Sequence, residues 1–223
     1  MLAMAIMTGV FICVSCNDSR NNEVTFPDPN LEMAIREAID KLEGPIYLED
    51  LQELTMLSAT DMGINDLSGL EYCTNLSILY LGSNEITDVS PLSELDKLSG
   101  LYMMGNQISD IAPLISLSNL TELELSFNKI TDISSLSSAS FTNLSSLGLN
   151  GSPETNQISD ISSLATLTNL RTVMLWNNQI SDVSPLLELP ELETVFILQG
   201  NPLDDNSLNI YIPELEARAV QVI

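Results

Sequence analysis

The chain's 223 residues are enough for one sizeable domain, and 31 Asp and Glu against 7 Lys and Arg give it a formal net charge of −24. Such acidity is typical of a solvated monomer and disfavours nucleic acid as a partner, because phosphate backbones repel a polyanion; basic partners and weak binding of divalent cations are the alternatives. The sequence has no histidine, so the commonest general base and the commonest metal ligand are missing, and we expect no cofactor and no structural metal.

The first element, residues 1–16, is predicted to be a signal peptide. The stretch from Met1 to Val14 is almost wholly apolar but shorter than the roughly 20 residues that cross a membrane, which fits a secretory signal. It ends in a Cys-Val-Ser-Cys run at Cys16 and is followed at once by polar residues. This resembles a bacterial lipobox and implies that Cys16 carries a lipid; the alternative is an ordinary signal peptide, with Cys16 removed or free. We therefore expect export, with a lipid anchor at the cell membrane or outer envelope surface, or secretion without one.

A flexible linker over 17–26 is expected to precede an N-terminal helical cap over 27–48. Asp28 suits the helix N-cap and Pro29 the first helical position, while Gly44 and Pro45 would end the helix. Two charged pairs are spaced for i,i+4 contacts on the outer side, Glu32 with Arg36 and Glu37 with Lys41. The inner face is expected to consist of Leu31, Ala34, Ile35, Ala38, Ile39 and Leu42.

Residues 49–200 repeat one pattern through about seven units, with a step of 22 residues that relates Leu54, Leu76, Leu98 and Leu120. An insertion of two residues within 137–142 and one of four around 151–154 displace the later units without ending the pattern. Each unit reads L-x-x-L-x-L-x-x-N-x-I-x-D-I-x-x-L-x-x-L. The L-x-L alternation predicts a strand whose leucines face inward and whose x residues face outward.

Two polar positions recur in the units and are predicted to form structural ladders. A buried Asn amide that ends each strand can bond the backbone of its own and the neighbouring coil. An Asp ahead of the next apolar turn is suited to capping a single 3₁₀ or helical turn; a cation-binding ladder is the alternative for this row. The Asn row is Asn84, Asn106, Asn128, Asn156 and Asn178, and the Asp row is Asp66, Asp88, Asp110, Asp132, Asp160 and Asp182.

This pattern, over about residues 50–200, resembles the bacterial leucine-rich repeats of the internalin type, and the segment 26–39 resembles the N-terminal caps that precede such repeats. The resemblance implies an α/β repeat fold: a gently curved solenoid with parallel strands on its concave face and short turns on its convex side. It also implies protein–protein recognition by the concave face. Residues 201–223 are expected to form a C-terminal cap, with a helix from Ser207 to Arg218 and a final strand from Val220 to Ile223.

The outward x positions carry most of the candidate binding residues. Only 5% of the chain is aromatic, yet its single Trp lies at these positions together with two Tyr and one Phe. Tyr, Trp and Met beside one another are typical of interface hot spots, although single exposed apolar residues are common on any surface. The candidate protein-binding residues are Ile78, Tyr80, Tyr102 and Met104 in one patch, Met174, Trp176 and Phe196 in a second, and Glu122 and Glu124 between them.

We therefore predict a non-catalytic module that binds a protein on its concave face. Binding of carbohydrate or cell wall is the alternative, because Tyr and Trp also stack on sugars. A carboxylate dyad of Glu122 and Glu124 is disfavoured as a catalytic site, because carboxylates on an open, wet surface stay ionised. Cys73 occupies an apolar position of its repeat and is interpreted as a buried small hydrophobe.

The lipobox makes the first testable prediction. Replacing Cys16 with Ala should abolish incorporation of an alkyne fatty acid in the expressing cell, because the thiol is the attachment atom. Labelling followed by gel fluorescence measures this, with Cys73→Ala as the control that retains the label. Equal labelling of the Cys16→Ala variant and the parent chain would contradict lipidation at Cys16.

Overall fold

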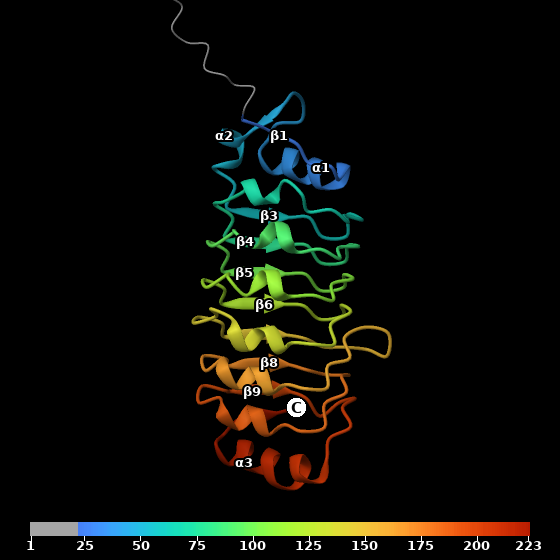
Figure 1. The fold of residues 1–223 in the computed structure, drawn as a ribbon, viewed down its shortest axis with the longest axis vertical. Coiled ribbons are helices and arrows are strands. Elements are labelled where there is room, and N and C mark those ends of the chain that lie inside the picture. Colours follow the sequence, from blue (N-terminus) through green and yellow to red (C-terminus); the bar gives the residue numbers. More distant parts are fainter. Residues whose placement is uncertain (1–21) are drawn as a thin grey trace, which may run out of the picture.

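The computed structural model describes residues 22–223, so the predicted signal peptide and Cys16 lie outside the described residues. The chain winds into a stack of similar coils between a cap at each end (Figure 1). Each coil contributes one short parallel strand, and the strands follow one another in chain order in an eight-stranded sheet that ends with β10. The seven strands of the repeats are β3 (Met56–Ser58), β4 (Ile78–Tyr80), β5 (Gly100–Tyr102), β6 (Glu122–Glu124), β7 (Ser146–Gly148), β8 (Thr172–Met174) and β9 (Thr194–Phe196).

Strand pairing keeps the repeat in register along the stack. Leu57 pairs with Leu79 and Leu79 with Leu101, and the later strands continue the same row. The inward leucines are almost completely buried, at 0–2% exposure from Leu57 to Leu147 in this row. Since each coil buries its apolar edge only against its neighbours, the core is one continuous column. The predicted leucine-rich-repeat solenoid, with parallel strands and short turns, is therefore confirmed.

Short 3₁₀ turns form the side opposite the sheet. At or just before the start of each turn, an Asp carboxylate accepts a hydrogen bond from the backbone. In the coil of η3, Asp88 Oδ1 accepts a bond from Ser90 N at 2.8 Å, and the same i to i+2 bond recurs in every coil from Asp66 to Asp182. The backbone donor at Ser134 lowers the pKa of Asp132, and that at Ser162 lowers the pKa of Asp160. The turns are η2 (Leu70–Tyr72), η3 (Ser90–Leu92), η4 (Ala112–Leu114), η5 (Ser134–Ser138), η6 (Ser162–Thr166) and η7 (Ser184–Glu188).

A column of buried asparagines joins each coil to the one before it. Asn128, at 0% exposure, accepts from Ile108 N through Oδ1 at 3.0 Å and donates through Nδ2 to Met103 O and Leu125 O, both at 3.0 Å. The amide thus satisfies a donor and an acceptor of the preceding coil and an acceptor of its own. The same pattern of bonds recurs at Asn84, Asn106, Asn156, Asn178 and, at the start of the C-terminal cap, Asn201.

A second asparagine row, which the sequence analysis did not identify, lies on the surface. Asn119 Nδ2 donates to Asp96 O of the preceding coil at 2.7 Å, and Asn75, Asn143 and Asn169 make the equivalent bond. In the coil where Lys97 occupies this position, its ammonium reaches Asn75 Oδ1 instead. Because these amides are exposed or partly so, water can replace them and their contribution to stability is smaller.

The N-terminal cap begins earlier than predicted. Strand β1 (Glu23–Val24) pairs antiparallel with β2 (Ile46–Tyr47), and the side chains of Val24 and Phe26 are 6% and 5% exposed. Residues 23–26 are therefore part of the packed cap, and the expected linker over 17–26 is wrong for them. The reason is that Val24 and Phe26 supply apolar surface that covers the open end of the core.

Asp28 fastens the cap helix to the first coil. Helix α1 (Pro29–Ala38) begins at Asp28, whose Oδ1 accepts from Asn30 N and Leu31 N, while its Oδ2 accepts from Asn65 N and Asp66 N. Burial by itself raises the pKa of Asp28, but these four backbone donors outweigh it and the pKa is lowered. One carboxylate therefore serves both as a helix cap and as a tie between two elements.

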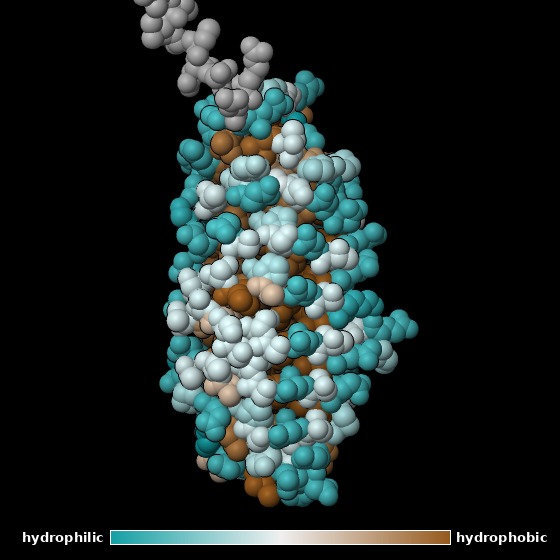
Figure 2. All heavy atoms as spheres, viewed as in Figure 1, coloured by the Kyte–Doolittle hydropathy of each residue, from teal (hydrophilic) through white to brown (hydrophobic). Residues whose placement is uncertain are grey.

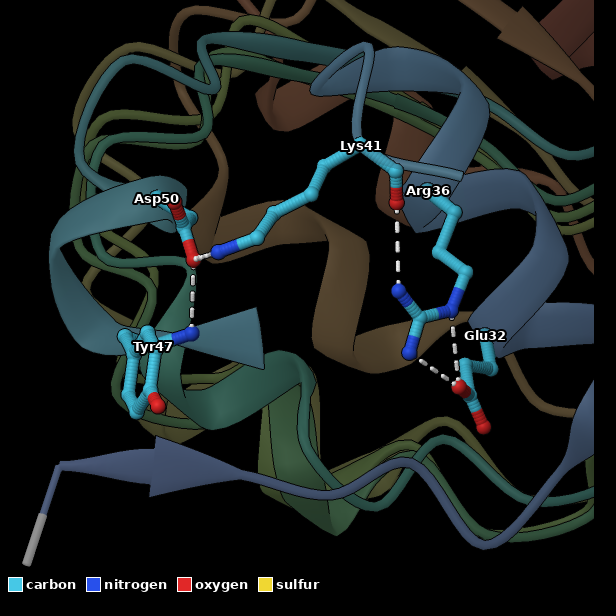
Figure 3. Close-up of polar contacts among 5 residues, drawn as sticks. All are labelled: Glu32, Arg36, Lys41, Tyr47 and Asp50. Carbon is cyan, nitrogen blue, oxygen red and sulfur yellow. Dashed lines mark hydrogen bonds and ion pairs between the residues drawn. The ribbon is translucent and has the colours of Figure 1, made fainter. Parts of the chain in front are cut away.

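The cap helix also ends earlier than predicted. It stops at Ala38, and Asp40 adopts a left-handed φ of 53°, so Leu42 falls outside the helix and is 69% exposed rather than on the buried face. The pair Glu32–Arg36 is present at 2.8 Å. The expected pair of Glu37 with Lys41 is wrong: because the chain has turned, Lys41 Nζ reaches Asp50 Oδ2 at 2.6 Å, in the short helix α2 (Leu48–Leu51) (Figure 3).

The C-terminal cap closes the other end of the column. Its helical segment runs through η8 (Ser207–Tyr211) and α3 (Ile212–Ala217), as predicted, and β10 (Gln221–Val222) adds the last parallel strand beside β9. Ser207 is fully buried and bonds the last coil twice, by accepting from Val183 N and by donating to Ser181 O. Along the whole stack the apolar core remains mostly covered: Figure 2 shows hydrophilic side chains along the edges of the visible face and brown mainly between the paler residues.

Neither cap adds a membrane segment: over residues 22–223, no helix combines the length and the apolar character that crossing a bilayer requires.

The two asparagine rows make a matched stability prediction. Asn128→Ala should lower the free energy of unfolding by about 3 kcal/mol, because it strands buried backbone groups in two coils. Asn119→Ala removes one exposed bond and should change it by less than about 1 kcal/mol. Urea unfolding followed by circular dichroism measures both values. Similar losses of unfolding free energy in the two variants would contradict the idea that burial makes the Asn128 row the more important one.

Candidate functional site

The outward side of the eight-stranded sheet, here named the strand face, is where the sequence places its candidate binding residues. Register brings seven of the predicted residues into two rows that cross the strands, while Met104 and Trp176 lie two residues beyond β5 and β8. The row of Tyr80 contains Ser58, Tyr80, Tyr102, Glu124, Gly148, Met174 and Phe196. The adjacent row contains Met56, Ile78, Gly100, Glu122, Ser146, Thr172 and Thr194.

Tyr80 and Tyr102 form the centre of the first patch. Their rings stack with centroids 4.7 Å apart and an interplanar angle of 12°. Gly100 makes this arrangement possible, because a Cβ there would lie 3.0 Å from Tyr102 Cε2 and 3.2 Å from its Oη. The ring of Tyr102 therefore lies close against the sheet, and its hydroxyl donates to Glu122 Oε2 at 2.7 Å.

The surroundings of Tyr102 favour its neutral form. Burial raises the pKa of the hydroxyl most, followed by the bond to Glu122 and the negative charge of that carboxylate, and the pKa of Tyr102 reaches about 12. The phenol thus remains a hydrogen-bond donor at all ordinary pH values. Its position is held by the ring stack on one side and by Glu122 at the hydroxyl end.

A chain of hydrogen bonds runs from Glu124 towards the second patch. The carboxylate Oε1 of Glu124 accepts from Ser126 N at 2.7 Å, Ser126 Oγ accepts from Asn150 N at 3.0 Å, and Asn150 Oδ1 accepts from Trp176 N at 2.9 Å. Gly148 leaves room for the Glu124 carboxylate, since a Cβ at that position would clash with it. The middle of the strand face is therefore polar and internally bonded, and it fixes the backbone next to Trp176.

Trp176 and Phe196 form the second patch, together with Met174. Their rings meet edge to face, with centroids 5.1 Å apart and an interplanar angle of 86°. The indole Nε1 is buried and has no hydrogen-bond partner among residues 22–223. What Trp176 presents to the outside is therefore ring carbon, and the patch is apolar in character.

The predicted binding residues differ in accessibility. Met104 and Glu122 are exposed, and the other seven, from Ile78 to Phe196, are partly exposed. The structure brings Tyr80, Tyr102 and Glu122 into contact, and separately Trp176 and Phe196.

Three exposed apolar residues at or beside the strand face were missing from the prediction: Met56, Phe127 and Leu198, which are 51%, 39% and 44% exposed. Phe127 has a φ of 58°, at a repeat position where Ser83, Asn177 and two glycines also have positive φ. A bulky residue is strained there by about 1–2 kcal/mol. The sequence signal was available, because Phe127 occupies the place that Gly105 fills one coil earlier.

Among the described residues, neither the hollow at the N-terminal cap nor the thiol of Cys73 belongs to the strand face. Within the described part of the chain, no three Asp, Glu, Cys or His side chains come together as a metal site. The Asp row instead bonds the backbone of its own turns. A hollow of about 410 Å³ lies at the N-terminal cap between Glu23, Arg36 and Ile46, away from the strand face. Cys73 is buried, and burial, with a smaller effect of Glu71, raises its thiol pKa to about 12.

Comparison with known proteins gives matches across the repeats. The family described as "Leucine Rich repeats (2 copies)" matches residues 52–94, 74–116, 96–138, 118–166 and 168–209. The crystal structure of the internalin InlF from Listeria monocytogenes is 34% identical over 81% of this chain, with a TM-score of 0.67, and this chain spans 58% of it. Internalin C2 from the same organism is 33% identical over 88% of this chain and 92% of its own, with a TM-score of 0.63.

A leucine-rich-repeat protein of Leptospira interrogans shares the fold at 23% identity, with a TM-score of 0.61 over 72% of this chain and 40% of its own. A search of curated proteins found no match.

The environment of Tyr102 makes a prediction in pH. The absorbance difference between the parent chain and Tyr102→Phe should show one tyrosine that ionises near pH 12 instead of about 10. Glu122→Gln should lower that midpoint, because it removes the neighbouring charge. Since the folded-state pKa is above the unfolded one, the stability from this group is complete below about pH 10 and is lost as pH rises towards 12. A midpoint near 10 in the parent chain would contradict the burial of the Tyr102 hydroxyl, and an unchanged midpoint in Glu122→Gln would contradict its contact with Glu122.

Proposed function

We propose that this chain, which belongs to the bacterial internalin-type leucine-rich-repeat family, is a non-catalytic module that binds a partner protein through its strand face. The observation that carries the proposal is the gathering of stacked and edge-to-face aromatic rings on one side of a rigid sheet. In a chain with 5% aromatic residues, these rings are not part of the core, which consists mostly of leucine, isoleucine and valine. Partly exposed Tyr and Trp are the side chains that most often dominate protein interfaces.

Pre-organisation supports the same proposal. Contacts within the chain already hold each aromatic ring: Tyr102 by Tyr80 and Glu122, Trp176 by Phe196. Binding therefore immobilises few additional rotamers, which reduces the entropic cost of association. The face is also an open surface and not a deep pocket, which suits a macromolecular partner better than a small ligand.

Sugar binding is less well supported by this geometry. A sugar ring stacks on a free aromatic face, and the contacts here reduce the number of such faces: Tyr80 and Tyr102 cover one face of each other, and the edge of one ring of the Trp176–Phe196 pair meets the face of the other. Glycan binding therefore enters only as an outcome of the experiment below.

For location, we propose export to the cell envelope, with the lipid at Cys16 as the anchor. The support is the apolar stretch before Cys16 and the polar run after it. The module would then act outside the cytoplasm as a monomer.

The experiment is site-specific photo-cross-linking on cells that express the chain. A photo-reactive residue at position 102 or 176 should give a discrete protein adduct, identified by mass spectrometry. Tyr72, which is 47% exposed on the turn side in η2, is the matched control position and should give none. With the partner in hand, Tyr102→Ala or Trp176→Ala should weaken binding by about 2 kcal/mol, roughly 30-fold.

Adducts of equal yield at all three positions would mean that the strand face is not special. Absence of a protein adduct at 102 and 176, in a chain that is folded and exported, would contradict the proposal. Retention of the parent chain on a glycan array, with loss in Trp176→Ala, would then assign the face to sugar.

A further inference from the structure

The strand face carries two carboxylates that have no basic partner within residues 22–223. Glu122 and Glu124 are carboxylates on one strand, and neither forms an ion pair within residues 22–223. Each has one oxygen engaged, Oε2 of Glu122 by Tyr102 and Oε1 of Glu124 by Ser126 N, and the other oxygen makes no bond within the described residues. The two side chains point to the same side of the sheet, because residues i and i+2 of a strand share a face.

The basic side chains of the described residues are all engaged elsewhere. Arg36 and Lys41 hold the N-terminal cap, and Arg171 pairs with Glu191 and Glu193. Lys97 reaches an asparagine, and Lys129 and Arg218 bond backbone carbonyls. None of them lies in the two rows that contain Tyr102, Glu122 and Glu124.

An aromatic ring borders the Glu122 carboxylate. Tyr80 covers the face of the Tyr102 ring that is turned towards β4, so its other face is turned towards β6, the strand of Glu122 and Glu124. Gly100 lets the Tyr102 ring pack close to the sheet, and the Glu122 carboxylate meets its hydroxyl. One ring face of Tyr102 and the carboxylate of Glu122 therefore border one place on the strand face, above β6, while the carboxylate of Glu124 leans over Gly148 on the other side of that strand.

We propose, on the basis of the function proposed above, that this place receives an arginine side chain of the partner protein. A guanidinium is planar, stacks on aromatic faces and donates several bonds in one plane, so it can stack on Tyr102 and bond the Glu122 carboxylate at once, with the charge of Glu124 adding attraction from the other side of β6. An ammonium has a point charge and no face to stack. The charge of −24 on the chain draws a basic partner, and this site fixes where its arginine binds.

The test uses a defined probe and the purified full chain. The probe is the acetylated, amidated pentapeptide Gly-Gly-Arg-Gly-Gly, and its counterpart contains citrulline, which has the shape of arginine without the charge. Amide chemical shifts are followed by NMR as peptide is added at low salt. We expect saturable shifts at residues 100, 102, 122 and 124, with the arginine peptide at least tenfold tighter than the citrulline peptide.

Charge-matched variants separate a site from a diffuse field. Glu122→Gln should weaken the arginine peptide at least threefold, and Glu124→Gln should weaken it less, because its carboxylate is farther from the Tyr102 ring. Glu94→Gln removes the same charge from an exposed residue beyond η3, on the turn side, and should have no effect. Unchanged circular dichroism spectra and melting temperatures in all three variants would show that the folds are equivalent.

Three outcomes would overturn the proposal: equal affinity for the arginine and citrulline peptides, equal weakening by Glu94→Gln, or a lysine peptide that binds as tightly as the arginine peptide. These outcomes are distinct from failure of the proposed function. A cross-linked partner whose contact region has no arginine would refute this inference and leave protein binding intact. Absence of any partner would refute protein binding whatever the peptide does.

Discussion

Burial of backbone polar groups between coils is the constraint on which this structure depends. A coil of 22 residues has too little interior to pair its own turn backbone, so groups after each strand would be stranded in the core. The asparagine column solves this with one side chain per coil: Asn128 accepts from Ile108 N and donates to Met103 O and Leu125 O. An amide is suited to this task because it donates and accepts in one plane. Hydrophobic burial makes the stack stable, and the amide determines which backbone groups of neighbouring coils face each other.

Strict register between coils also determines which side chains meet on the strand face. Because the strands pair in strict register, an outward residue in one coil has a known neighbour in the next, as Tyr80 has Tyr102. The inward leucines and the asparagine carry the fold, so the outward positions are free to vary without cost to the core. The glycines at 100 and 148 show that these positions are also adjusted to one another, because each makes room for a neighbouring side chain.

The sequence predicts the repeating parts of this molecule more completely than the parts that occur once. The period, the strands and the turns follow from a pattern seen in about seven units, and every unit reinforces the prediction, whereas the C-terminal helix is predicted from its local sequence alone. The N-terminal cap occurs once, so its early strand at Glu23–Val24 and the early end of α1 at Ala38 had no second copy to reveal them. For the site, the rows could be predicted because alternation in a strand is local. The stack of Tyr80 on Tyr102, the bond to Glu122 and the strained Phe127 could not, because they depend on rotamers and backbone angles in two coils at once.

The in-register column has an evolutionary consequence. Gain or loss of one whole coil keeps every asparagine opposite its backbone partners, so changes in multiples of the repeat are the ones that the fold accepts most readily. Each coil placed between the tyrosine and tryptophan patches would move them apart by one strand spacing, about 4.8 Å, and leave the residues of both unchanged. Smaller length changes are confined to the loops, such as the one near residue 154 that projects from the side of the stack (Figure 1). Under the binding function proposed above, whole-coil changes would alter the span between the two patches in fixed steps and suit partners of different size.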